Sequence, residues 1–183
     1  MHLRHADPSA DAAACAAIYA PYVASSVISL EDVPPAVEEF GQRIERIAER
    51  YPYLVAEDDD GRVIAFAYGS LHRERAAYRW ACESSVYVDE TRRRRGTGRA
   101  LYEALFDLLR RQGLQVVCAG ITLPNDASVS LHESFGFELV GVYRRIGWKA
   151  GTWHDVGWWA LDLVAPSAEV PPEPGPPVRL PAR

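Results

Sequence analysis

The sequence lacks the features that mark several broad classes of protein. It has only three cysteines, Cys15, Cys82 and Cys118, and no Cys-x-x-Cys pair, so it offers neither a disulfide framework nor a zinc-ligand spacing. It has no apolar run of the roughly 20 residues that cross a bilayer, and its N-terminus lacks the pattern of a signal peptide. We therefore expect a cytoplasmic protein with no metal centre and no membrane contact.

The sequence also has little positive charge. Lysine and arginine total 20 against 25 aspartates and glutamates, which gives a formal charge of -5. A protein that coats nucleic acid is normally basic, so this balance argues against such a role. What remains is an ordinary globular composition in 183 residues, 48% of them apolar. This is enough chain for one domain with a substantial core.

Apolar periodicity divides the chain into alternating strands and helices. Parallel strands need a long crossover, so few neighbouring strands of this chain can be parallel. We therefore expect an α/β fold of the α+β type, with a mixed, mostly antiparallel sheet flanked by helices. The expected strands are 2–5, 53–57, 62–71, 78–88, 115–121, 138–148 and 152–163, and the expected helices run through 15–22 and over 36–51, 96–113 and 125–137.

The end of the chain differs in composition from the rest. Residues 165–183 contain seven prolines, which exclude a helix or a central strand. We expect residues 1–164 to form the domain and residues 165–183 to form a disordered, proline-rich tail.

Four consecutive arginines, 92–95, stand between an expected strand and an expected helix that opens on Gly96-Thr97-Gly98. A helix N-terminus behind glycines presents free N–H groups to a phosphate. A P-loop lysine and a third dinucleotide-binding glycine are both missing. The stretch instead matches Arg/Gln-x-x-Gly-x-Gly/Ala, the pyrophosphate loop of the GNAT acetyltransferases. A solvated basic turn and a nucleic-acid patch are the alternatives, and no second basic segment supports the latter.

On this motif and three further stretches, the chain resembles the phosphinothricin N-acetyltransferase family of the GNAT superfamily. The matching stretches are RYPYLVAE, AYRWACESSVYVDETRRRRGTGRALYEAL, LPNDASVSLHESFGF and WKAGTWHDVGWW, and the resemblance covers about residues 2–163. The resemblance implies the GNAT fold and a homodimer. It also implies acetyl transfer from acetyl-CoA to the α-amino group of phosphinothricin, methionine sulfoximine or a related amino-acid analogue.

The resemblance also assigns residues to acetyl-CoA. Backbone groups of Val86, Tyr87 and Val88 would pair with the pantetheine arm, and an N–H near Tyr87 or Val88 could stabilise the thioester oxyanion. The Asn125 side chain would contact the cofactor near its thiol, a role compatible with capping the next helix. The backbone N–H groups expected to hold the pyrophosphate are those of Arg94, Arg95, Gly96, Thr97, Gly98 and Arg99.

The transfer needs a base, because an α-amino group is largely protonated at neutral pH. Glu83 lies in an expected strand among mostly apolar residues, which would favour proton uptake near neutral pH, and the resemblance places the base there too. An edge-strand glutamate facing solvent is the alternative. His132 has a family counterpart close to the reaction centre, which suggests a part in proton transfer, although a lone helical histidine is commonly structural.

The stretch before the strand of the expected base suits an acidic substrate. Arg73 and Arg75 carry planar guanidinium groups that can bind a phosphinate or carboxylate, and the family has basic residues there. We expect Tyr78 and Ser85 in the same pocket. Leu30 stands where close family members often carry phenylalanine, facing the substrate side chain. Substrate choice therefore stays open between phosphinothricin-like compounds, methionine or its sulfone, and a protein amine. A non-catalytic CoA sensor is the alternative from another class.

Overall fold

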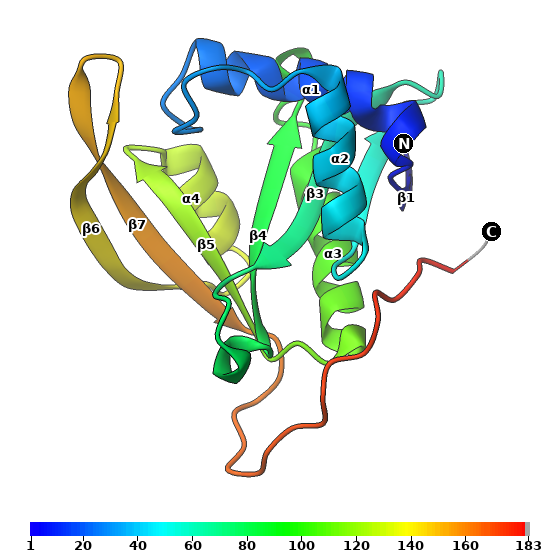
Figure 1. The fold of residues 1–183 in the computed structure, drawn as a ribbon, viewed down its shortest axis with the longest axis vertical. Helices are drawn as coiled ribbons and strands as arrows, with labels where there is room; N and C mark the ends of the chain where they lie inside the picture. The colour runs from blue at the N-terminus through cyan, green and yellow to red at the C-terminus, as the bar shows by residue number, and fades with distance from the viewer. Residues whose placement is uncertain (182–183) are drawn as a thin grey trace.

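A computed structural model describes residues 1–181, and its elements follow the expected alternation (Figure 1). Across these residues one seven-stranded sheet has the order β1-β2-β3-β4-β5-β7-β6, and only β4 and β5 pair in parallel. The predicted mixed, mostly antiparallel sheet is confirmed. The strands are β1 (His2–His5), β2 (Tyr53–Glu57), β3 (Val63–Leu71), β4 (Ala81–Val88), β5 (Val116–Leu123), β6 (Glu138–Lys149) and β7 (Thr152–Asp162).

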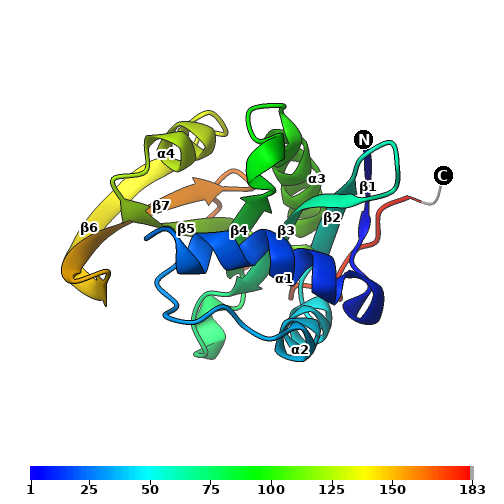
Figure 2. The ribbon, with the colours of Figure 1, turned by 90° about the horizontal axis from the view of Figure 1, so that it is seen from above.

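Helices cover both faces of the sheet (Figure 2). The helices α1 (Pro8–Ala24) and α2 (Val37–Ala48) lie on one face, and α3 (Thr97–Gln112) and α4 (Asp126–Glu133) lie on the other. Two short 3-10 turns, η1 (Ala76–Tyr78) and η2 (Glu90–Arg92), flank β4. The strand predicted from residue 78 therefore begins at Ala81, because η1 occupies the residues before it. No helix within residues 1–181 is long and apolar enough to span a bilayer.

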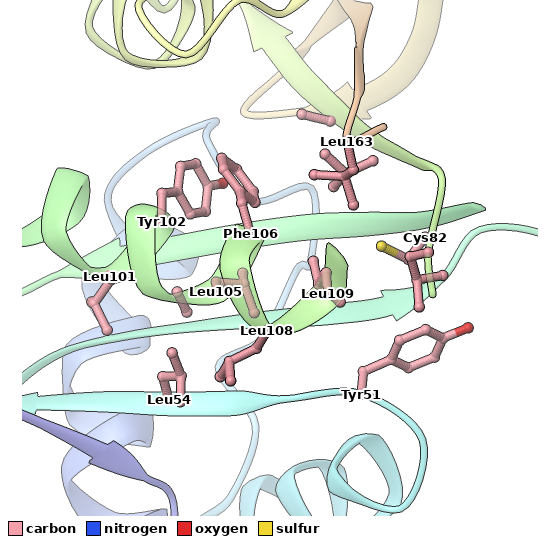
Figure 3. Close-up of a cluster of buried hydrophobic side chains, with 14 of the residues drawn as sticks. Tyr51, Leu54, Cys82, Leu101, Tyr102, Leu105, Phe106, Leu108, Leu109 and Leu163 are labelled. Atoms are coloured by element: carbon pink, nitrogen blue, oxygen red, sulfur yellow. The ribbon is translucent and has the colours of Figure 1, made fainter. Parts of the chain in front are cut away.

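Burial of α3 anchors the larger part of the core (Figure 3). All four leucines of its apolar face are fully buried at helical spacing against Leu54 and its neighbours on the sheet. The helix ends where predicted, at Gly113 with φ 101°, a conformation that glycine adopts without steric cost. The four leucines are Leu101, Leu105, Leu108 and Leu109.

The sheet opens between β4 and β5. These strands pair only at Ala81–Glu83 with Val116–Cys118, whereas β4 stays paired with β3 up to Val88 and β5 stays paired with β7 up to Leu123. Because each strand keeps its outer partner, their C-terminal halves diverge, as Figure 1 shows. This opening positions the candidate site.

The proline-rich segment lies along the body of the protein in this structure. The Trp80 indole donates to the Pro172 carbonyl at 2.9 Å, Arg79 pairs with Glu173 at 2.7 Å, and Leu180 packs against the α3 core. The two residues beyond 181 lie outside the described part of the chain. The division into a domain and a disordered tail stays a prediction, and these contacts show where the segment docks.

Candidate active site

The opening between β4 and β5 is a cleft with one orphaned polar atom on its wall. The Ser84 hydroxyl is buried, and within residues 1–181 it has no hydrogen-bond partner, so a polar group in the cleft could bind it. The predicted substrate residue Ser85 lines this cleft. The lining residues are Ile28, Ser84, Ser85, Val86, Tyr87, Tyr102, Ala119, Gly120, Ile121, Thr122, Asn125, Ser128 and His132.

The backbone of β4 faces this opening at alternate residues. Asp89 donates its N–H to β3 at 2.8 Å, so Tyr87, two residues earlier, also turns its backbone groups to β3. Val86 and Val88 therefore face the opening. Both backbone groups of Val88 are already bonded to the Tyr22 hydroxyl, which donates to the Val88 carbonyl at 2.6 Å and accepts from the Val88 N–H at 3.2 Å. Of the three residues assigned to the pantetheine arm, Val86 keeps both backbone groups free within residues 1–181.

The turn before α3 exposes a run of backbone N–H groups. Arg94 has φ 62° and Gly96 has φ 79°, both in the left-handed region. These conformations curl the chain so that successive N–H groups point into one concavity, an arrangement called a nest. Gly96 is the N-cap residue and brings no side chain to cap α3. Within residues 1–181 no acceptor takes the N–H groups from Arg94 to Arg99. This cradle has the donors and the helix polarity that suit a pyrophosphate.

The arginines of the cradle divide into paired and free side chains. Arg92 and Arg93 form ion pairs with acidic residues at 3.2 and 3.1 Å. Arg99 donates to a serine hydroxyl at the end of α4 at 2.6 Å and stacks on a phenylalanine ring at 4.9 Å. In the described part of the chain, Arg94 and Arg95 have no ion-pair partner. These two guanidinium groups are free to attract a phosphate.

Asn125 lies at the far wall of the cleft and caps α4. Its Oδ1 accepts the Ser128 N–H at 3.2 Å, so the expected capping role is confirmed. The amide nitrogen has no hydrogen-bond acceptor within residues 1–181. Capping and contact with a ligand in the cleft are therefore compatible.

His132 is a buried, neutral residue in the cleft wall. Its Nδ1 donates to the Ser128 carbonyl at 2.8 Å, and its Nε2 lies 3.2 Å from the Tyr102 hydroxyl, which donates to it. Burial lowers the pKa of His132, and the bond to Ser128 opposes this only in part. Both ring nitrogens are engaged, so the ring braces the wall. A part in proton transfer stays a prediction.

Glu83 is the last β4 residue paired with β5. Cys82 and Ser84 are buried, whereas Glu83, on the other face of β4, is 28% exposed. The surroundings differ from the apolar setting we expected. Glu83 Oε1 lies 3.0 Å from His72 Nδ1 and 3.6 Å from Arg73 Nη1, because the chain after β3 turns back over the carboxylate.

The predicted substrate arginines share an open hollow at the end of β3. Its lining includes Arg73, Arg75 and Tyr78, together with His72. Arg73 lies 5.7 Å over the Trp158 ring, which holds its guanidinium beside Glu83. The structure therefore places the expected base 3.6 Å from one expected anion-binding residue, Arg73, which lines the hollow together with Arg75.

The Lys-x-Gly-x-Trp-His-Asp stretch builds a hairpin that holds the loop 25–36 in place. Lys149 donates to the carbonyls of Val23 at 2.6 Å and Ser29 at 2.7 Å, and His154 donates to the Lys149 carbonyl at 2.9 Å. Asp155 accepts the Arg145 N–H at 2.8 Å, where β6 bulges. The motif therefore has a structural role, since it holds the loop whose Ile28 lines the cleft.

Leu30 packs against this hairpin. A Cβ built on Gly147 would lie 2.5 Å from Leu30 Cδ1, so the leucine occupies the space that glycine leaves. From the same loop, Ile28 reaches the cleft lining. Ile28 is therefore a cleft residue that our sequence reasoning missed, since nothing in its neighbourhood marks which side chain of the loop points inward.

Cys118 lies beside Glu83 in the β4–β5 ladder. Burial raises the pKa of its thiol, and the Glu83 carboxylate raises it further. A thiol is a weak nucleophile until it ionises, so this pair disfavours a cysteine nucleophile. Within residues 1–181, no group of three or more histidines, cysteines or acidic residues could hold a metal ion.

The chain is similar to known acetyltransferases. Residues 5–158 match the acetyltransferase (GNAT) domain. The chain is 41% identical over 170 residues to phosphinothricin N-acetyltransferase of Streptomyces viridochromogenes, covering 93% of this chain and 91% of that protein. It is 39% identical over 118 residues to an L-methionine sulfoximine/L-methionine sulfone acetyltransferase of Pseudomonas aeruginosa, covering 64% and 69%. A phosphinothricin acetyltransferase from Sinorhizobium meliloti, crystallised with acetyl-CoA, superposes with a TM-score of 0.89 at 35% identity, covering 94% and 93%.

Proposed function

This chain belongs to the phosphinothricin N-acetyltransferase family of the GNAT superfamily and is an acetyl-CoA-dependent N-acetyltransferase, and we propose that it acetylates the α-amino group of phosphinothricin, methionine sulfoximine or a related amino-acid analogue. One observation carries the proposal. Glu83 ends the pairing of β4 with β5, next to the opening, and its Oε1 lies 3.6 Å from Arg73, which lines the same hollow as Arg75.

The residues present fit acetyl-CoA. The cradle from Arg94 to Arg99 would hold its pyrophosphate, Val86 would pair with its pantetheine arm, and Asn125 would contact it near the thiol. When bound, the cofactor supplies an acetyl group activated as a thioester. The free N–H of Val86 faces the opening and would stabilise negative charge that develops on the thioester oxygen.

Glu83 acts as the general base in this proposal. It takes a proton from the substrate ammonium group, directly or through water, and the free amine then attacks the acetyl carbon. The new carbon–nitrogen bond forms as the carbon–sulfur bond breaks. The second proton of the attacking nitrogen passes to the sulfur, so that CoA leaves as its thiol, and Glu83 gives its proton back to water. The attack is direct, because Cys118, the nearest thiol to Glu83 along the ladder, is held in its protonated form.

A substrate panel tests the proposed specificity. We expect CoA release with phosphinothricin and methionine sulfoximine, because Arg73 and Arg75 can bind their acidic groups. Methionine, methionine sulfone and a short peptide with a free N-terminus serve as comparison substrates in the same assay. Turnover on methionine or its sulfone alone would move the specificity to the ordinary amino acids, and turnover on the peptide alone would favour a protein amine.

A homodimer is the second part of the proposal. The hairpin of β6 and β7 is the edge of the sheet and exposes a band of large apolar side chains, which soluble monomers rarely do. A second copy of the chain would cover this band. Its members are Leu139, Val140, Val142, Tyr143, Ile146, Trp148 and Trp153.

We expect a dimer in sedimentation velocity and a monomer after Ile146→Glu, because a charge in the middle of the band would be buried without a partner. Val33→Glu is a matched control, since this valine is also exposed but lies on the loop before α2. A monomeric wild-type protein at working concentration contradicts this part of the proposal and leaves the reaction untouched.

A further inference from the structure

His72 is a side chain of the hollow to which the proposed function gives no role. It directly follows β3, where Ser70 is opposite Glu83 in the β3–β4 ladder. Two residues further along, His72 therefore lies on the same face as Glu83 and is its diagonal neighbour. This register explains why its Nδ1 comes within 3.0 Å of Glu83 Oε1.

The His72 ring is fixed by its surroundings. Its side chain is 16% exposed, and its ring is edge-to-face with the rings of Tyr78 and Trp158, with centroids 5.9 and 6.0 Å apart. Arg73 donates to the His72 carbonyl at 2.8 Å, which holds the backbone of the same residue. A ring packed between two aromatic side chains on a fixed backbone loses little freedom when it makes a hydrogen bond, so the contact with Glu83 is preorganised.

The contact engages one oxygen of the carboxylate and leaves the other free. Oε1 faces both His72 and the Arg73 guanidinium, whereas within residues 1–181 no hydrogen-bond donor reaches Oε2. We propose that His72 is a positioning residue for Glu83: its Nδ1–H holds Oε1, so that Oε2 is presented to the substrate amine. This inference rests on the proposed role of Glu83 as the base.

The test compares His72→Phe with His72→Asn. Phenylalanine keeps an aromatic ring against Tyr78 and Trp158 but has no N–H, whereas the asparagine amide places an N–H close to the position of Nδ1. The measurement is kcat and KM for one substrate at a single neutral pH with saturating acetyl-CoA, since a positioning role should change kcat more than KM.

For His72→Phe we expect kcat to fall about tenfold with KM nearly unchanged, because Oε2 is no longer held toward the amine, and for His72→Asn we expect kcat within about twofold of the wild type. His2→Leu, on β1 at the opposite edge of the sheet, is the control and should keep the wild-type kcat. If His72→Phe does not fold, His72→Leu replaces it. An unchanged kcat for the variant without the donor overturns the inference, as does a His72→Asn variant that loses as much kcat as His72→Phe.

Failure of the inference and failure of the proposed function are distinguishable. If Glu83→Gln turns over at the wild-type rate, Glu83 is not the base, and His72 then has no base to position. If Glu83→Gln is inactive but His72→Phe keeps the wild-type kcat, Glu83 remains the proposed base and only the role of His72 is rejected.

Discussion

Replacing Glu83 by glutamine is expected to lower kcat by about 10²- to 10⁴-fold, the usual contribution of a general base, while acetyl-CoA binds with nearly unchanged affinity. Glutamine has the shape of glutamate and can still accept a hydrogen bond, but it cannot take the proton of an ammonium group. Because Glu83 lies beside the hollow and the cradle lies beyond the end of β4, the change should affect the chemical step alone. Steady-state kinetics and calorimetric titration with acetyl-CoA measure the two quantities separately.

Two controls sharpen this experiment. Cys118→Ser removes the thiol beside Glu83 and should keep most of the activity, since direct attack has no use for a nucleophilic cysteine. Raising the pH should restore part of the Glu83→Gln rate, because more of the substrate amine is then free without a base. Turnover of Glu83→Gln equal to wild type across this range would show that another group, or water alone, takes the proton.

Most of the fold could be predicted from the sequence. The apolar face of α3 repeats at helical spacing, and Gly113 ends the helix with the positive φ that its position predicts. The main difference is at the start of β4, where the aromatic residues Tyr78 and Trp80 suggested a strand. Tyr78 instead belongs to the 3-10 turn, and Trp80 contacts the proline-rich segment, since its indole donates to the Pro172 carbonyl. Local strand propensity gave no information about that long-range contact.

The candidate site could be predicted less completely, because its residues meet through register and packing. Nothing local in the sequence indicates that the Tyr22 hydroxyl bonds the backbone of Val88, 66 residues away. His72 could be found only once the β3–β4 register was known, since a shift of one residue would turn it to the other face. Single-sequence patterns identified chemically suitable residue types, and the fold decided which of them touch.

The glycines of the cradle give the second large expected effect, in which stability and cofactor binding change in opposite directions. Gly98 is the second residue of α3, and a Cβ at this position would meet Val88, Leu131 and Val86 at 3.6 to 3.8 Å, which is ordinary packing distance. Replacing a glycine inside a helix stabilises it by roughly 0.5–1 kcal/mol. A carboxylate in the first turn adds about 0.3–1 kcal/mol, because it faces the positive end of the helix dipole. Gly98→Asp should therefore unfold at a higher temperature than the wild type.

The same substitution should weaken acetyl-CoA binding by about 100-fold or more. The aspartate carboxylate would compete for the N–H groups of the cradle, and two like charges about 4 Å apart near a protein surface repel by up to about 4 kcal/mol. Gly98→Ala is the matched control, with the stability gain and without the charge, and should bind within about tenfold of the wild type. Thermal unfolding and calorimetric titration with acetyl-CoA give both quantities. Equal affinities for Gly98→Asp and Gly98→Ala would mean that the pyrophosphate lies elsewhere, and a lower unfolding temperature for Gly98→Asp would mean that the helix start is strained rather than open to a side chain.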